Sequence, residues 1–135
     1  MDAAKFILGA CSGAYIVPPE IPPTTSIVQR ISTRAWFPTQ HAGFQGHFPG
    51  NALLPGFLHV ELVLDILRIP FSHVELCSVQ NAKFLRPVLA YEIIVVLLSL
   101  EADGSVAAQL HVSGVVVSEL ALEVSVAASC PDQKS

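Results

Sequence analysis

The feature that most constrains the fold is a helix that is apolar on nearly every side. Pro55 has the fixed backbone angle that suits a first helical turn, and the helix is predicted to run to about Arg68, before Pro70 stops it. At 1.5 Å per residue this length gives roughly 21 Å, a core helix rather than a membrane span. A helix with apolar side chains all round is buried all round, so the rest of the chain must wrap it. Its polar interruptions before the end are His59, Glu61 and Asp65.

The remaining segments are predicted to be mostly strands. Asp103-Gly104 and Ser113-Gly114 are strong signals for tight hairpin turns. Short connections of this kind make consecutive strands antiparallel neighbours. The pattern therefore predicts an α+β domain in which an antiparallel sheet curls around one long helix. The expected strands are Ser26–Trp36, His73–Phe84, Glu92–Glu101, Ser105–Ser113 and Val115–Ala127.

The chain of 135 residues is expected to be a single domain, 1–135, long enough to bury a core without metal or disulfide staples. Residues 1–24, with their glycines and prolines, are predicted to be an irregular lead-in. Pro38–Leu54 is predicted to be a loop because glycine, proline and asparagine punctuate it. Residues 131–135 are expected to be a polar tail.

Composition narrows the possible partners. Apolar residues make up 52% of the chain and charged residues 13%, against about 25% charged in an average soluble domain. A second copy is the simplest cover for so much apolar surface, so we expect an oligomer. A net charge of −4, without a basic block, argues against a nucleic-acid partner.

The cysteines and the hydropathy indicate a cytoplasmic protein. Cys11, Cys77 and Cys130 are odd in number and lack C-x-x-C spacing, as expected of reduced thiols rather than a disulfide framework or a zinc site. No apolar run approaches the roughly 18 residues of a membrane helix. The other histidines show no ligand spacing, so we expect no metal site; they are His41, His73 and His111.

The most specific chemistry lies between Phe44 and Glu61. His47 stands in a tight Gly/Pro loop, and Glu61 follows fourteen positions later inside the apolar helix. The Pro55-Gly56 pair opens that helix between them. A base and an acid are thus placed near an apolar wall, which proton chemistry on an acyl chain requires.

These residues resemble a known family. His47-Phe48-Pro49-Gly50, then Leu54-Pro55-Gly56, then Glu61 resembles the β-hydroxyacyl-(acyl carrier protein) dehydratases of the FabZ and FabA type. Phe84-Leu85-Arg86-Pro87-Val88 is similar to the family's later F-x-R-P-V strand. The likeness covers about residues 25–127. It implies the hot-dog fold and a homodimer in which His47 of one protomer meets Glu61 of the other as the catalytic pair.

The implied function is the dehydration of 3-hydroxyacyl thioesters on an acyl carrier protein to trans-2-enoyl thioesters. Neutral His47 would take the proton from C2. Glu61 would donate a proton to the leaving oxygen; its apolar neighbours, and Asp65 one turn later, disfavour its charged form. The amide of Gly56, at the helix N-terminus, would face the thioester oxygen. This chemistry needs no metal or organic cofactor.

Other residues receive secondary roles. Phe48, Pro55 and Phe57 are candidates for lining the substrate site, with packing as the simpler role for the aromatic rings. His59 is two residues from Glu61, on a different face of the helix, and is expected to be structural, as is Asp65. Lys83 and Arg86 are weaker candidates for docking an acidic carrier protein or its phosphopantetheine phosphate.

The chain also departs from the family pattern. Ala52 replaces the usual proline and Leu54 the usual methionine, while Leu62 and Asp65 replace a small residue and a glutamine after the acid. The family's N-terminal segment is also replaced. These changes predict a divergent branch serving fatty acid, polyketide or polyene biosynthesis. They leave two alternatives open: a hot-dog acyl thioesterase, and a non-catalytic hot-dog partner subunit or acyl-binding module.

Overall fold

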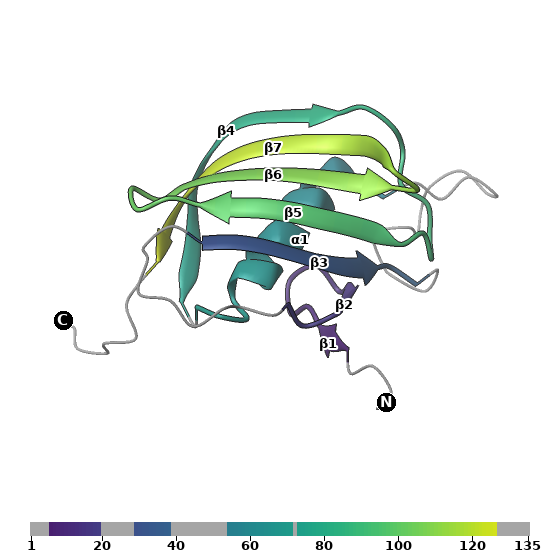
Figure 1. The fold of residues 1–135 in the computed structure, drawn as a ribbon, viewed down its shortest axis with the longest axis horizontal. Coiled ribbons are helices and arrows are strands. Elements are labelled where there is room, and N and C mark those ends of the chain that lie inside the picture. Colours follow the sequence, from purple (N-terminus) through teal and green to yellow (C-terminus); the bar gives the residue numbers. More distant parts are fainter. Residues whose placement is uncertain (1–5, 20–28, 39–53, 72, 127–135) are drawn as a thin grey trace.

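The computed structural model describes residues 6–19, 29–38, 54–71 and 73–126. Within these residues, one helix lies behind a curled antiparallel sheet of seven strands (Figure 1). This arrangement confirms the predicted α+β hot-dog fold. The elements are α1 (Gly56–Leu67), β1 (Ile7–Leu8), β2 (Tyr15–Ile16), β3 (Gln29–Trp36), β4 (Val74–Phe84), β5 (Ile94–Leu100), β6 (Ser105–Val112) and β7 (Val115–Val126).

Helix α1 begins and ends where the sequence predicts. Pro55 is the N-cap residue, with φ of −61° and ψ of 148°, so its ring enforces the extended entry into the first turn. Arg68 is the C-cap residue, and its N–H bonds to the carbonyl of Leu64 at 3.0 Å. Pro70 follows and cannot continue the helical ladder.

The strands follow the order β1-β2-β3-β5-β6-β7-β4. Strands β5, β6 and β7 form the predicted meander, and the turns use Gly104 at φ 93° and Ser113-Gly114 at φ 53° and 80°. Positive φ at both central residues gives a turn that matches the twist of the flanking strands. Strand β4 differs from the expectation of pairing with its sequence neighbour: it pairs with β7 at the far edge. The connection over 85–93, which includes Pro87, leads from β4 at the edge past β7 and β6 to β5 in the interior of the sheet.

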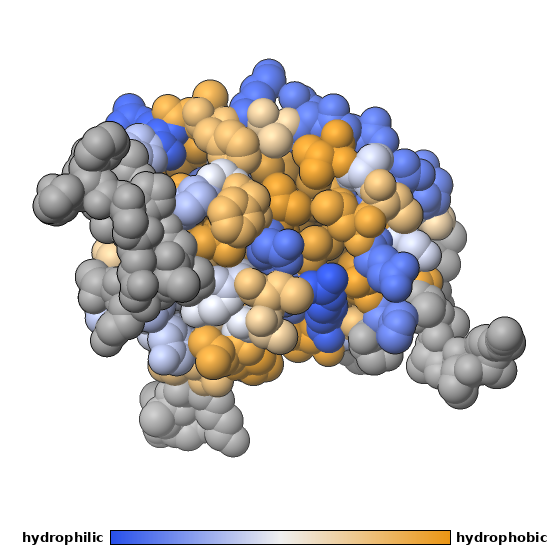
Figure 2. All heavy atoms as spheres, turned by 180° about the vertical axis from the view of Figure 1, so that it is seen from behind, coloured by the Kyte–Doolittle hydropathy of each residue, from blue (hydrophilic) through white to orange (hydrophobic). Residues whose placement is uncertain are grey.

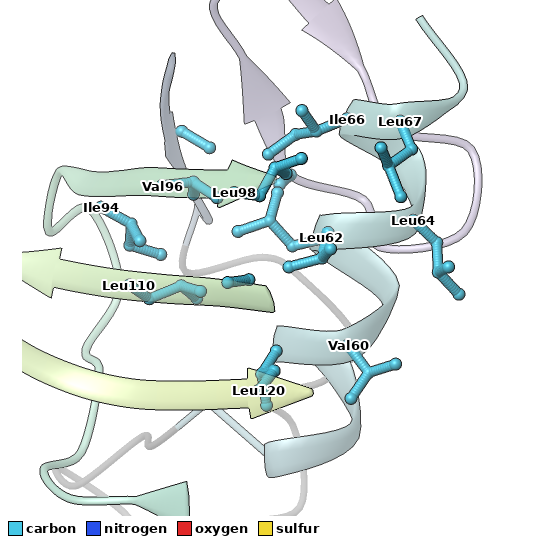
Figure 3. Close-up of a cluster of buried hydrophobic side chains, with 14 of the residues drawn as sticks. Val60, Leu62, Leu64, Ile66, Leu67, Ile94, Val96, Leu98, Leu110 and Leu120 are labelled. Atoms are coloured by element: carbon cyan, nitrogen blue, oxygen red, sulfur yellow. The ribbon is translucent and has the colours of Figure 1, made fainter. Parts of the chain in front are cut away.

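The core lies between α1 and the concave face of the sheet. Alternate residues of β5 and β6 point at the helix, as the period of two in a half-buried strand requires. In Figure 3 the side chains of Leu62 and Ile66 meet this face, whereas Val60 and Leu64 point away from it. All four are nonetheless buried, so the helix is covered on several sides, as its apolar sequence predicts.

The lead-in is more ordered than the sequence predicts. Residues 1–24 were expected to be irregular, but β1 and β2 form a small hairpin whose second strand pairs with β3, Tyr15 lying opposite Trp36. Stacking of these two rings, with centroids 5.5 Å apart, contributes to the pairing. Two-residue strands are too short to show the alternation from which strands are predicted.

In the described part of the chain, no helix is long and apolar enough to cross a membrane.

Hydrophobic residues remain exposed over much of the molecule. Seen from behind the sheet, they cover a broad field broken by a few polar side chains (Figure 2). Phe57 is 64% exposed and Leu85 is 54% exposed. Apolar side chains that one chain leaves uncovered are typical of an interaction surface.

Candidate active site

A pocket of about 290 Å³ opens where the first turn of α1 meets the end of β4. Its walls are mainly apolar, with an imidazole and a guanidinium as the polar groups. The backbone N–H groups of a first helical turn have no carbonyl ahead of them in the helix, so they are available to a ligand. The pocket is lined by Leu54, Gly56, His59, Phe84, Leu85, Arg86 and Pro87.

Gly56 lies close against the ring of Phe84. A Cβ placed on Gly56 would lie 2.9 Å from Cζ of Phe84 and 3.0 Å from Cε2 of the same ring. These distances are shorter than van der Waals contact, so any side chain at position 56 would push the ring aside. The absence of a side chain at position 56 therefore allows the Phe84 ring to lie close to the opening of the helix.

His59 lies one turn further into the pocket. Its side chain is 2% exposed, and its Nδ1 is 2.9 Å from the hydroxyl oxygen of Ser118 on β7. The Phe84 ring stands edge-to-face against the imidazole, with centroids 5.1 Å apart. Burial lowers the pKa of His59 from 6.5 to about 4, because desolvation disfavours the charged ring. The imidazole is therefore neutral at neutral pH.

Glu61 lies on a different face of α1 from His59 and does not line this pocket. It is half-buried and stands one turn after the exposed Phe57, on the side of the helix that the sheet leaves uncovered. Among the described residues, no hydrogen bond or ion pair engages its carboxyl group. The structure thus places Gly56 and Glu61 on neighbouring faces of one helix rather than around a common cavity within a single chain.

Asp65 joins the helix to the lead-in. It is 5% exposed, and its carboxylate accepts hydrogen bonds from the N–H groups of Ser12 at 2.7 Å and Cys11 at 3.1 Å. Arg68 pairs with the same carboxylate at 3.4 Å and also donates to the carbonyl of Val74. These partners compensate the buried charge of Asp65.

The two departures from the family pattern, at Asp65 and in the lead-in, are therefore linked by direct contacts. The acid replaces a glutamine of the resembled family, and the segment that supplies its backbone donors is the one that also looks replaced. A carboxylate that accepts several N–H bonds can be buried without an unsatisfied charge. The predicted structural role of Asp65 thus has a physical basis in these contacts.

The basic residues and the remaining candidates are placed as follows. Lys83, near the end of β4, and Arg86, at the pocket wall, are both exposed, so their charges face solvent. Pro55 is half-buried at the N-cap. His47 and Phe48 lie outside the described residues, so their predicted roles stay predictions.

Among the described residues, three larger depressions, of about 580, 610 and 410 Å³, lie over the strands and contain none of the candidate residues. The first is lined by both exposed and buried residues of the central strands, including Leu97 and Gln109, and has no titratable cluster near an apolar wall. Within the described ranges, no group of three or more His, Cys, Asp or Glu side chains is arranged to hold a metal ion.

Comparison with known proteins places these features in a family. A family model described as ApeI-like, ApeI dehydratase, matches residues 24–121, a range that includes both His47 and Glu61. The dehydratase heterocomplex ApeI:P from Xenorhabdus doucetiae superposes with a TM-score of 0.68 at 15% identity, covering 81% of this chain and 95% of that one. An uncharacterized protein from Erwinia carotovora subsp. atroseptica gives a TM-score of 0.67 at 18% identity, covering 80% and 96%.

Proposed function

The chain belongs to the ApeI-like dehydratase family, and from that premise we propose that it converts 3-hydroxyacyl thioesters on an acyl carrier protein to trans-2-enoyl thioesters. The observation that carries the proposal is the family match over residues 24–121, which spans the histidine loop, the helix opening and the acid. The narrower resemblance to FabZ and FabA enzymes stays a prediction, and so does the pathway: fatty acid, polyketide or polyene synthesis in the cytoplasm.

The proposed reaction transfers two protons and needs no external oxidant or reductant. His47 accepts the proton from C2, and the electron pair of that C–H bond moves toward the thioester carbonyl. The N–H of Gly56 stabilises the charge that develops on the carbonyl oxygen. The C3–O bond then breaks while the carboxyl group of Glu61 donates a proton, so that the hydroxyl group leaves as water. Each residue then returns to its starting state by proton exchange with solvent, and no cofactor is needed.

A dimer is part of the proposal. By resemblance to the FabZ and FabA enzymes, His47 of one protomer would face Glu61 of the other. Two features of this chain support a partner over the acid: the exposed Phe57 one turn before Glu61, and the absence of a hydrogen bond to the Glu61 carboxyl group in the described part of the chain. A carrier protein bearing the acyl chain on phosphopantetheine would dock near Lys83 and Arg86, which are exposed beside the pocket.

The test is a product assay with two variants. Purified protein is incubated with a carrier-linked 3-hydroxyacyl chain, and the acyl products are identified by mass spectrometry. We expect His47→Ala and Glu61→Gln each to keep the wild-type mass in solution and to reduce enoyl formation at least about a hundredfold, the usual contribution of a general acid or base. Full activity in either variant removes that residue from the mechanism. Release of free thiol without enoyl product assigns a thioesterase instead.

A second candidate function is supported by one observation. The solved structure from Xenorhabdus doucetiae is described as a heterocomplex of ApeI and P. This chain could likewise act as one subunit of a mixed dimer, with or without its own turnover. The product assay is run on this chain alone and on this chain co-expressed with a partner subunit. Activity only in the mixture favours the heterocomplex, and activity of the chain alone favours the homodimer.

A further inference from the structure

Large apolar side chains gather at the β1 edge of the sheet, the edge away from β4 (Figure 1). Leu8, Tyr15 and Trp36 lie opposite one another on β1, β2 and β3, so their side chains share one face. The Phe6 ring stands edge-to-face against Trp36, with centroids 4.4 Å apart. Ile93, the residue before β5, comes next in the same row. The aromatic patch is defined by these residues: Phe6, Leu8, Tyr15, Trp36 and Ile93.

The aromatic patch is exposed and takes no part in the proposed reaction. Leu8 is 60% exposed and Ile93 is 49% exposed, whereas Trp36 is half-buried. Within the described ranges, the indole N–H of Trp36 and the hydroxyl group of Tyr15 have no hydrogen-bond partner. None of the four depressions described above is lined by a patch residue. The patch is therefore a surface without a pocket, and its polar ring atoms are available to an external partner.

The charges beside the patch are sorted by sign. Arg34 lies two residues before Trp36 on the same face of β3; it is exposed, and no acid pairs with it in the described part of the chain. Glu119 and Glu123, on the same face of the sheet, lie on β7, the third strand from β3. Glu92 is nearer, but its carboxylate accepts a backbone N–H of its own loop. The patch thus adjoins an unpaired positive charge.

We propose that the aromatic patch binds the surface of an anionic lipid bilayer. Tryptophan and tyrosine rings have an apolar body and a polar tip, so they are stable at the level of the lipid headgroups. Phe6 and Leu8 enter the acyl boundary, and the Arg34 guanidinium binds lipid phosphate. The chain rests on the bilayer by one edge of its sheet and does not cross it. This binding does not depend on the proposed reaction.

Shape and charge favour lipid over another protein surface. The dominant side chains of a protein interface sit in well-packed pockets of the partner and the protein, and the patch offers no pocket. A bilayer is fluid and needs no complementary shape. A symmetric contact of the patch with a second copy would bring two unpaired Arg34 side chains into one interface, where like charges repel.

The fluorescence of Trp36 reports directly on the patch, because it is the only tryptophan of the chain. Full-length protein is titrated with vesicles of phosphatidylcholine mixed with phosphatidylglycerol, and with vesicles of phosphatidylcholine alone. We expect the anionic vesicles to shift the emission to shorter wavelength and brominated lipid to quench it. Neutral vesicles and added salt should weaken the effect, since charge attraction is screened. Unchanged emission with the anionic vesicles overturns the proposal.

Two arginines of β3 provide a matched pair of variants. Arg34→Gln should weaken vesicle binding about fivefold, the worth of one basic residue near an anionic surface. Arg30→Gln is the control: the residue is also exposed on this face of β3, but it lies four residues away, roughly 13 Å along the strand. It should have the smaller effect. Equal losses from both variants overturn the proposal, because the attraction would then not belong to the patch.

A second pair tests the apolar contact. Leu8→Ser should weaken binding about fivefold, because its exposed apolar surface no longer enters the bilayer. Leu97→Ser, at an exposed leucine of the same face outside the patch, should leave binding unchanged. An equal effect of the two changes contradicts the assignment. Thermal unfolding checks the fold of each variant, and the titration of the wild type stands without them.

The same fluorescence identifies the rival occupants. Without vesicles, a shift that grows with protein concentration assigns the patch to a second copy, and a shift caused by a soluble acidic carrier protein assigns it to a protein partner. Either result, together with unchanged emission on vesicles, overturns the proposal. Enoyl formation from soluble substrates should be unaffected in Arg34→Gln and Leu8→Ser, so the proposed function and the membrane contact are tested separately.

Discussion

At the scale of single residues, His59 makes the stability of the protein depend on pH. The folded chain holds the pKa of this imidazole at about 4, below its ordinary value of 6.5, because the ring is desolvated. Between these values the unfolded chain binds more protons than the folded one, so protonation favours unfolding. The stabilisation is complete above about pH 6.5 and is lost as the pH falls toward 4.

The expected loss is at most about 3 kcal/mol, the free energy equivalent of the shift in pKa. Chemical denaturation of the wild type and His59→Phe at about pH 7, 5.5 and 4.5 measures it. The wild type should lose stability relative to the variant as the pH falls, because phenylalanine does not titrate. A difference between the two proteins that stays constant across this range would contradict the prediction. The comparison cancels contributions from His73 and His111, which both proteins share.

At the scale of elements, Asp65 ties the β1–β2 hairpin to α1. Replacing Asp65 with alanine leaves the N–H groups of Cys11 and Ser12 without their acceptor and Arg68 without its counter-charge. We expect the free energy of unfolding to fall by about 2–3 kcal/mol, since buried donors then lose their partners. Urea denaturation at neutral pH provides the measurement.

Asp65→Asn is the control for this contact, because it keeps one acceptor oxygen and the side-chain shape. It should lose less stability than Asp65→Ala. Hydrogen exchange at the amides of Cys11 and Ser12 gives a local measurement, and both amides should exchange faster in the alanine variant. Unchanged exchange at both positions would mean that the lead-in is held by other contacts.

The sequence predicts well those elements whose pattern is repeated over many residues. The apolar run that follows Pro55 ends shortly before Pro70, and α1 follows those bounds. The alternation in β6 is likewise visible in the sequence, whereas β5 is a continuous apolar run in which only the burial alternates. The pairing of β4 with β7 is not visible, because a strand exposed on both faces carries no preference for one neighbour.

The candidate site is only partly predictable, for a different reason. Gly56 could be identified because the helix opening is a local feature. The serine partner of His59 lies on β7, so the pairing depends on the packing of the helix against a distant strand. The spacing of Gly56 and His59, three residues apart on one face of α1, is the signal that could have joined them.

At the scale of the whole molecule, β4 forms one edge of the sheet, and we expect the dimer of the proposed function to pair through this edge. It ends the strand order, so one side of its backbone has no strand partner within the described residues (Figure 1). Leu76 is 39% exposed and Val79 is 46% exposed, so this edge also carries apolar side chains. Long exposed edges of this kind pair readily with another chain.

A lysine on this edge should oppose association. We expect Val79→Lys to weaken the dimer, because pairing would then desolvate a charge on each copy. The control is Leu97→Lys, a change of the same kind at a residue that is 42% exposed on another strand. Light scattering coupled to size exclusion gives the mass in solution. The proposed contact is wrong if Val79→Lys stays dimeric at the concentrations at which the wild type does.

The close approach of Gly9 to Asp65 limits which substitutions the chain tolerates at these two positions. A methyl group on Gly9 would lie 2.4 Å from Oδ2 of Asp65, so neither position accepts a bulkier occupant while the other stays as it is. Two sites far apart in the sequence thereby constrain each other, so a side chain at position 9 requires a change at position 65 or a shift of the first hairpin.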